Sequence, residues 1–229
     1  MESEIPLIHS LSLILLYLVT IVIVAESLSR FFNKVNSEFT RKIVHIGAGN
    51  VILFAWWLDV PAWIGIGAAA IASSIALISL VIPILPSVNS VGRKSLGTFF
   101  YAISIGVLIA LFWHLHEYEY AAIGILIMTW GDGMAAIVGQ RFGKHHYRVF
   151  GIKKSWEGSL AMAFFSFLVT CSILVAVQGN IWQVWAISLT VSVVATVLEG
   201  FSVLGIDNLT VPIASAGLAY YCCYFLIHV

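Results

Sequence analysis

Long apolar runs alternate with short polar breaks along the whole chain. The runs cover residues 6–28, 42–58, 61–85, 96–113, 119–140, 157–178, 181–200 and 210–228. A helix needs about 20 mostly apolar residues to cross a bilayer, and backbone groups inside lipid must find their hydrogen-bond partners within the protein. The pattern therefore predicts an all-α fold, that of a polytopic integral membrane protein with about eight transmembrane helices.

The composition supports this class of protein. Of the 229 residues, 61% are hydrophobic and 10% are charged, whereas a soluble domain carries about 25% charged residues. The net charge is zero, so the chain lacks the basic excess of nucleic-acid-binding proteins and we expect no nucleic-acid partner. We expect a single transmembrane domain over residues 1–229, in which residues 1–40 form the first helix and a cytoplasmic loop and residues 41–228 form the helical core.

The basic residues are distributed unevenly. All 11 lie in the connections after the first, third and fifth runs, counting Lys42 at the edge of the second run, and the connections after the second, fourth and sixth runs contain none. Lys and Arg collect in the cytoplasmic loops of membrane proteins. We therefore expect the odd-numbered connections, and any active site built from them, on the cytoplasmic side of the membrane, with both termini outside.

Asp132 is the most informative polar residue inside a run, in the segment Thr129-Trp130-Gly131-Asp132-Gly133. An Asp near the middle of a span costs about 2.5–3.5 kcal/mol on insertion scales, so it is a candidate for function by default. The alternative is an Asp that pairs with a basic loop residue for packing alone. Gly131, Ala135 and Gly139 form a stripe of small residues, which permits close helix approach at the same place.

The segment from Gly139 to Ser159 is the densest polar stretch and contains five cations. It is not a Walker A loop, because three residues separate Gly139 from Gly143 and a His follows Lys144. Ser155 is placed to cap the next helix, whose N-terminal amides attract phosphate. The stretch predicts a phosphate-binding loop, and the alternative is a basic anchor that only sets topology.

Two further basic clusters precede apolar runs on the same side. Arg93, Lys94 and Ser95 precede the fourth run, and Arg41 and Lys42 begin the second, with His45 one helical turn after Arg41. Helix openings at residues 93–95 and 153–155 would together clasp one polyphosphate. By themselves, Arg41 and Lys42 are also consistent with topological anchors.

Further acids fall at the same depth as the basic loops. Glu199 ends the seventh run, and Asp207 and Asn208 precede the eighth. Magnesium takes carboxylate and carboxamide oxygens together with phosphate oxygens and water. With Asp132, these three residues predict a magnesium site, and the alternative is loop polarity without a ligand.

The motifs and their order resemble the polyprenol kinase family, which includes dolichol kinase, phytol kinase and CTP-dependent diacylglycerol kinase. The likeness runs from about residue 41 to residue 212. Its motifs are Arg41-Lys42-x-x-His45, Gly92-Arg93-Lys94-Ser95-Leu96-Gly97-Thr98, Gly131-Asp132-Gly133, Phe142-Gly143-Lys144, Lys154-Ser155-x-Glu157-Gly158, and Glu199 with Asp207-Asn208. The resemblance implies a membrane enzyme that phosphorylates a lipid alcohol with CTP, sometimes UTP, and a divalent metal such as Mg²⁺.

On this resemblance we assign roles to individual residues. The expected metal ligands are Asp132, Asp207 and Asn208. The expected catalytic residues are Asp132, Glu199, Lys144 and Lys154, and either Asp132 or Glu199 accepts the proton of the lipid hydroxyl. The expected nucleotide-binding residues are Arg41, Lys42, Arg93, Lys94, Ser95, Gly143, Lys144, Lys153, Lys154 and Ser155.

Two alternatives stay open. The middle motifs are also similar to phosphatidate cytidylyltransferase, which makes CDP-diacylglycerol, although its usual Ser-Asp and Lys-Thr pairs read Gly131-Asp132 and Lys154-Ser155 here. An ion-coupled transporter is the more distant alternative, because Gly131-Asp132-Gly133 suits a broken helix, but the sequence shows no inverted repeat. The partners expected for the kinase are a nucleoside triphosphate and a membrane lipid alcohol.

Overall fold

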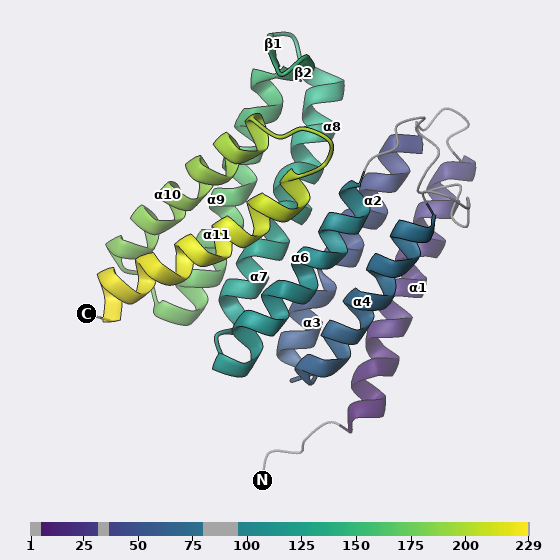
Figure 1. Ribbon diagram of the computed structural model, residues 1–229, viewed down its shortest axis with the longest axis vertical. Coiled ribbons are helices and arrows are strands. Elements are labelled where there is room, and N and C mark those ends of the chain that lie inside the picture. The colour runs from purple at the N-terminus through teal and green to yellow at the C-terminus, as the bar shows by residue number, and fades with distance from the viewer. Residues whose placement is uncertain (1–5, 32–36, 80–95, 229) are drawn as a thin grey trace.

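The computed structural model describes residues 6–31, 37–79 and 96–228. The helices there are almost all long and roughly side by side (Figure 1). Besides the α-helices and two short strands, the described residues contain a 3-10 turn (η1) and two π-helical turns (η2 and η3). In chain order the elements are α1 (Leu7–Phe31), α2 (Ser37–Gly49), α3 (Val51–Trp57), α4 (Ala62–Ile78), α6 (Gly97–Phe112), η1 (Trp113–Leu115), α7 (Tyr118–Leu126), η2 (Ile127–Asp132), α8 (Gly133–Phe142), β1 (His146–Val149), β2 (Ile152–Ser155), α9 (Trp156–Gln178), α10 (Trp182–Gly200), α11 (Asp207–Cys223) and η3 (Tyr224–His228).

These elements confirm the all-α fold class and the multi-pass membrane protein. Six helical segments are long and apolar enough to cross a membrane: Leu7–Ser27, Gly97–Leu115, Tyr118–Phe142, Trp156–Gln178, Trp182–Gly200 and Asp207–Ile227. Two shorter apolar segments, Val44–Trp57 and Ala62–Ile78, correspond to the second and third predicted spans. The predicted third span, 61–85, extends past Ser79 and so partly outside the described residues.

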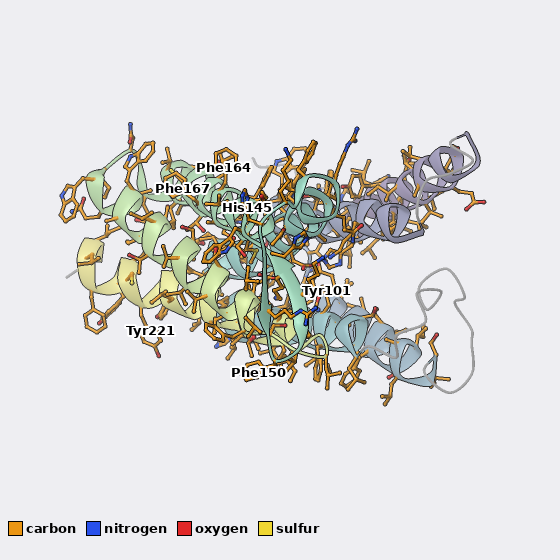
Figure 2. All side chains as sticks on the ribbon, turned by 90° about the horizontal axis from the view of Figure 1, so that it is seen from above. Tyr101, His145, Phe150, Phe164, Phe167 and Tyr221 are labelled. Atoms are coloured by element: carbon orange, nitrogen blue, oxygen red, sulfur yellow. The ribbon has the colours of Figure 1, made fainter. Side chains whose placement is uncertain are left out.

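Helix α7 forms the centre of the bundle. Every residue from Glu119 to Leu126 is buried, and the helix packs against α6, α9 and α11. Gly124 permits the contact with α11, because a Cβ at this position would collide with the backbone oxygen of Pro212. The outer surface is apolar instead: Leu15 and Leu16 of α1 are 62% and 63% exposed, as expected of side chains that face lipid. Figure 2 shows Phe164 and Tyr221 at opposite outer edges of the bundle.

The two ends of the bundle differ. The start of α1 and the end of α11 lie at one end, and the strands β1 and β2 lie at the other (Figure 1). The strands pair antiparallel, with Tyr147 opposite Lys154 and Arg148 opposite Lys153. Phe150 and Gly151 join them with φ of 47° and 81°, and two residues with positive φ are typical of a tight hairpin turn. The sequence interpretation treated this stretch as a loop and did not include the hairpin.

Candidate functional site

Three carboxylates from separate helices meet at the hairpin end of the bundle. Asp132 ends the π-helical turn, Glu199 lies in the last turn of α10, and Asp207 begins α11. One oxygen from each lies within 4.8 Å of the others, and all three residues are largely or partly buried. We call these three residues the acidic cluster. Like charges repel strongly at this spacing in a medium of low dielectric constant, so the cluster needs cations.

Two lysines supply opposite charge. Lys42 of α2 forms an ion pair with Asp132, and Lys154 of β2 forms one with Glu199 at 2.6 Å and also donates to the backbone oxygen of Glu199. The Lys42 and Lys154 side chains are only 11% and 14% exposed. Removing one partner of such a pair leaves a poorly solvated charge, which costs about 3–5 kcal/mol. The pairs therefore fix four residues that are far apart in the sequence.

The π-helical turn sets the position of Asp132. Within it, the Thr129 hydroxyl donates to the backbone oxygen of Ile125 at 2.6 Å and shares a hydrogen bond with the Tyr101 hydroxyl at 2.7 Å. The rings of Tyr101 and His45 lie 4.4 Å apart between centroids. Single π-helical turns inside α-helices occur frequently at functional sites. The turn thus contacts α2, α6 and α7 and supplies Asp132 to the acidic cluster.

The hairpin presents its cations on opposite faces because side chains alternate along a strand. Lys154 and its neighbour Tyr147 face the bundle, and the Tyr147 hydroxyl hydrogen-bonds with the Ser159 hydroxyl at 2.7 Å. Lys153 and Arg148 are exposed on the other face. Lys144, just before the hairpin, is exposed as well. Of the five cations in this stretch, Lys154 is therefore the one in contact with the acidic cluster.

Close backbone contacts hold the hairpin against the bundle. Ser155 caps α9, where its hydroxyl accepts a hydrogen bond from the Gly158 amide at 3.1 Å. A Cβ at Gly158 would lie 2.9 Å from the backbone oxygen of Ala135, and one at Gly139 would lie 3.0 Å from Oγ of Ser155. The predicted stripe of small residues, on η2 and α8, thus faces α9, and the predicted cap forms.

Comparisons with known proteins agree with this architecture. The sequence pattern of the cytidylyltransferase family matches residues 5–198. The chain is 52% identical to "Phytol kinase" of Synechocystis sp. over 94% of this chain and 92% of that protein. It is 30% identical to "Phytol kinase 1, chloroplastic" of Arabidopsis thaliana over 87% of this chain and 71% of that protein.

The chain belongs to the phytol kinase family, within the cytidylyltransferase family. This confirms the resemblance to the polyprenol kinases, and both relatives named here are phytol kinases. No solved structure matches the chain significantly.

The structure brings some of the predicted site residues of this phytol kinase family member together. Asp132, Glu199, Asp207, Lys42 and Lys154 form one connected group. Asn208 lies beside it, and its side-chain amide donates to Asp207 and to the backbone oxygen of Gly205, both at 3.2 Å.

Other predicted residues lie elsewhere. Lys144 and Lys153 are exposed, and Gly143 and Ser155 support the hairpin. Arg93, Lys94 and Ser95 lie outside the described residues, as does the side chain of Arg41.

Sequence reasoning missed Thr129 and Tyr101, which hold the turn that carries Asp132. One signal was available for Thr129: it precedes Asp132 by three residues in a segment already singled out. Tyr101 gave no comparable signal, because an aromatic residue in an apolar run is typical of packing.

Proposed function

We propose that this protein is a membrane kinase that transfers the γ-phosphate of CTP to the hydroxyl of phytol or a closely similar isoprenoid alcohol. The observation that carries the proposal is the group of three carboxylates and two lysines at one end of a lipid-embedded bundle. The identity of 52% to a protein named phytol kinase supports the choice of alcohol. Such a site places nucleotide chemistry at the end of the spans, within reach of a substrate whose tail stays in the bilayer.

The acidic cluster suits a magnesium ion. Its donors are carboxylate oxygens from three helices, and hard cations prefer oxygen ligands. Asp132 and Asp207 would hold the ion, with Asn208 alongside. When bound, Mg²⁺ supplies positive charge to the phosphate oxygens of the nucleotide.

The chain's own residues position the reactants and balance charge, which is most of what phosphoryl transfer requires. Lys154 and Lys42 lie against the acidic cluster and place positive charge where the transferred phosphoryl group would sit. The lipid oxygen bonds to the γ-phosphorus, the bond from that phosphorus to the bridging oxygen breaks, and CDP leaves. The hydroxyl proton passes to the carboxylate of Asp132 or Glu199.

The same nucleotide would react differently in the alternative function, cytidylyl transfer to phosphatidate. We therefore suggest that purified protein be given CTP labelled at either the α- or the γ-phosphate, together with Mg²⁺, phytol and phosphatidate. A kinase transfers γ-label to phytol and no α-label to any lipid. Appearance of α-label in a lipid would overturn the proposal in favour of cytidylyl transfer.

We also propose that the acidic cluster faces the cytoplasm, as the distribution of basic residues predicts. Arg148 is exposed at the hairpin end, so Arg148→Cys suits accessibility labelling after Cys171, Cys222 and Cys223 have been replaced. An impermeant thiol reagent should modify this cysteine only after the membrane is opened. Labelling of intact cells would contradict the orientation and place the acidic cluster away from cellular nucleotide.

A further inference from the structure

An apolar pocket of about 290 Å³ lies between α3, the α7–η2 segment and α9. We call it the lateral pocket, and its walls include Asn50, Leu53, Leu126, Trp130, Phe165 and Ser172. Leu53 and another wall residue, Leu168, are 39% and 42% exposed. Both belong to apolar helical segments, Val44–Trp57 and Trp156–Gln178, so we expect the lateral pocket to open toward lipid and not toward water.

The lateral pocket and the acidic cluster share the π-helical turn η2. Trp130 lines the pocket and precedes Asp132 by two residues within the same π-helical turn. Its indole Nε1 donates to Oδ1 of Asn50 at 2.9 Å, and its ring stacks on Phe165 with an interplanar angle of 16°. These contacts fix the wall of the pocket that belongs to the same turn as Asp132.

The wall residues on α9 lie at increasing distance from the acidic cluster. Helix α9 begins at the hairpin and runs away from it, so Phe165 lies nearer the acidic cluster than Ser172 does. At a rise of 1.5 Å per residue, the two positions are about 10 Å apart along the helix. A chain that starts at the acidic cluster and follows the pocket therefore passes Trp130 and Phe165 first and reaches Ser172 and Ile173 last.

We propose that the lateral pocket holds the isoprenoid tail of the lipid alcohol, with the hydroxyl at the acidic cluster, and that Ser172 at the far end sets how long a chain the pocket accepts. This inference rests on the proposed kinase function. A bilayer is as apolar as the pocket, so burial alone gives no preference for the tail over lipid. Selection must come from shape, and a larger side chain at the far end should exclude long tails by steric overlap.

Ser172→Phe tests the inference because the added ring would fill the far end of the pocket. We compare kcat/KM for alcohols of two, three and four isoprene units in wild type and in Ser172→Phe. The four-unit alcohol should lose about tenfold or more, the usual scale of overpacking, and the two-unit alcohol should stay within about twofold. Ser74→Phe on α4, the same change at an exposed position away from the pocket, should match wild type for every length.

The outcomes separate the two proposals. If wild type phosphorylates no alcohol, the kinase function is wrong. If wild type is active and kcat/KM of Ser172→Phe is unchanged, or reduced by the same factor, for alcohols of every length, the proposal that Ser172 limits the length of the tail is wrong.

A measurement on wild type makes the test independent of how the variant folds. A four-unit alcohol with a photoreactive group at its tail should crosslink to the α9 peptide that contains Ser172, and phytol should compete with it. Crosslinking to other helices only, or competition by bulk phospholipid but not by phytol, would overturn the proposal and leave the pocket to ordinary membrane lipid.

Discussion

The buried acids at the two ends of the helix bundle have different kinds of partner. At the hairpin end, acids from η2, α10 and α11 meet, and those from η2 and α10 pair with lysines from α2 and β2. At the opposite end, Glu119 is also buried, only 6% exposed, but it lies in the first turn of its own helix, where a negative charge is favourable. Around it the Tyr118 hydroxyl hydrogen-bonds with His116 at 2.8 Å and donates to Asp59 at 3.5 Å.

The difference lies in where the partners come from. Among the described residues, the opposite end shows no ion pair between lysine or arginine and an acid, whereas the hairpin end shows two. The position of Glu119 in the first turn of its helix accounts for a buried acid there, so no ligand is needed to explain it. Acids that converge from several helices repel one another, and a fold retains that repulsion where a ligand uses it. Mutations at the two ends should therefore have very different effects.

The largest effect is expected from Asp132→Asn, which keeps the side-chain volume but removes the charge. Turnover should fall by at least about a hundredfold, equivalent to about 2.7 kcal/mol in the barrier. Because the change also leaves Lys42 without its counter-ion, the double variant Lys42→Met with Asp132→Asn serves as the structural control. Thermal unfolding should show stability recovered in the double variant while activity stays lost, and near-normal activity of Asp132→Asn at saturating magnesium would count against the assigned role.

Lys154→Gln should reduce kcat/KM by about 10- to 150-fold, because a charge-assisted hydrogen bond contributes about 1.5–3 kcal/mol. Arg148→Gln is the matched control, since Arg148 lies in the same hairpin with its side chain exposed, and its rate should stay within about threefold. Lys144→Gln is the companion test for the predicted phosphate contact of Lys144, whose side chain is also exposed: a loss of the same size would support that contact, and a rate within about threefold would not. Unchanged rates for both lysine variants, with orientation intact, would leave the loop as a topological anchor.

Asp207→Asn should reduce activity by about 10- to 100-fold with little change in stability. The reason is that Asp207, unlike Asp132 and Glu199, forms no ion pair with a lysine in the part of the chain that the structure describes. The informative measurement is the initial rate as a function of magnesium concentration. A midpoint shifted to higher magnesium supports a metal ligand, and a lower rate with an unshifted midpoint would assign Asp207 a different role.

The smallest effect is expected from Asp59→Asn at the opposite end. Asp59 is exposed and has φ of 48°, a left-handed conformation that Asn also adopts readily. Both activity and stability should stay within about twofold and 0.5 kcal/mol of wild type. A loss as large as that of Asp207→Asn would remove the distinction between the two ends.

Much of the fold could be predicted from the sequence. Backbone groups in lipid must be hydrogen-bonded within the protein, so a long apolar run indicates a transmembrane helix. The same reasoning identified Asp132, Glu199 and Asp207 as polar residues at one depth. It did not reveal which lysine pairs with which acid, since Lys42 and Asp132 are 90 residues apart. Nor did it distinguish Lys154 from Lys153, because the stretch was interpreted as a loop and the alternation of a strand was not applied to it.

The π-helical turn from Ile127 to Asp132 sets the rotation of α8 about its axis relative to α7, and so the directions in which the side chains of α8 point. An α-helix turns about 100° for each residue, and the wider π-turn holds one residue more than an α-turn would. Loss of a single residue here would leave a continuous helix of nearly the same length. It would nevertheless rotate Gly133–Phe142 by about 100° against α7 and turn the small residues of α8 away from α9. Relatives aligned across this segment should therefore tolerate substitutions far better than a one-residue gap.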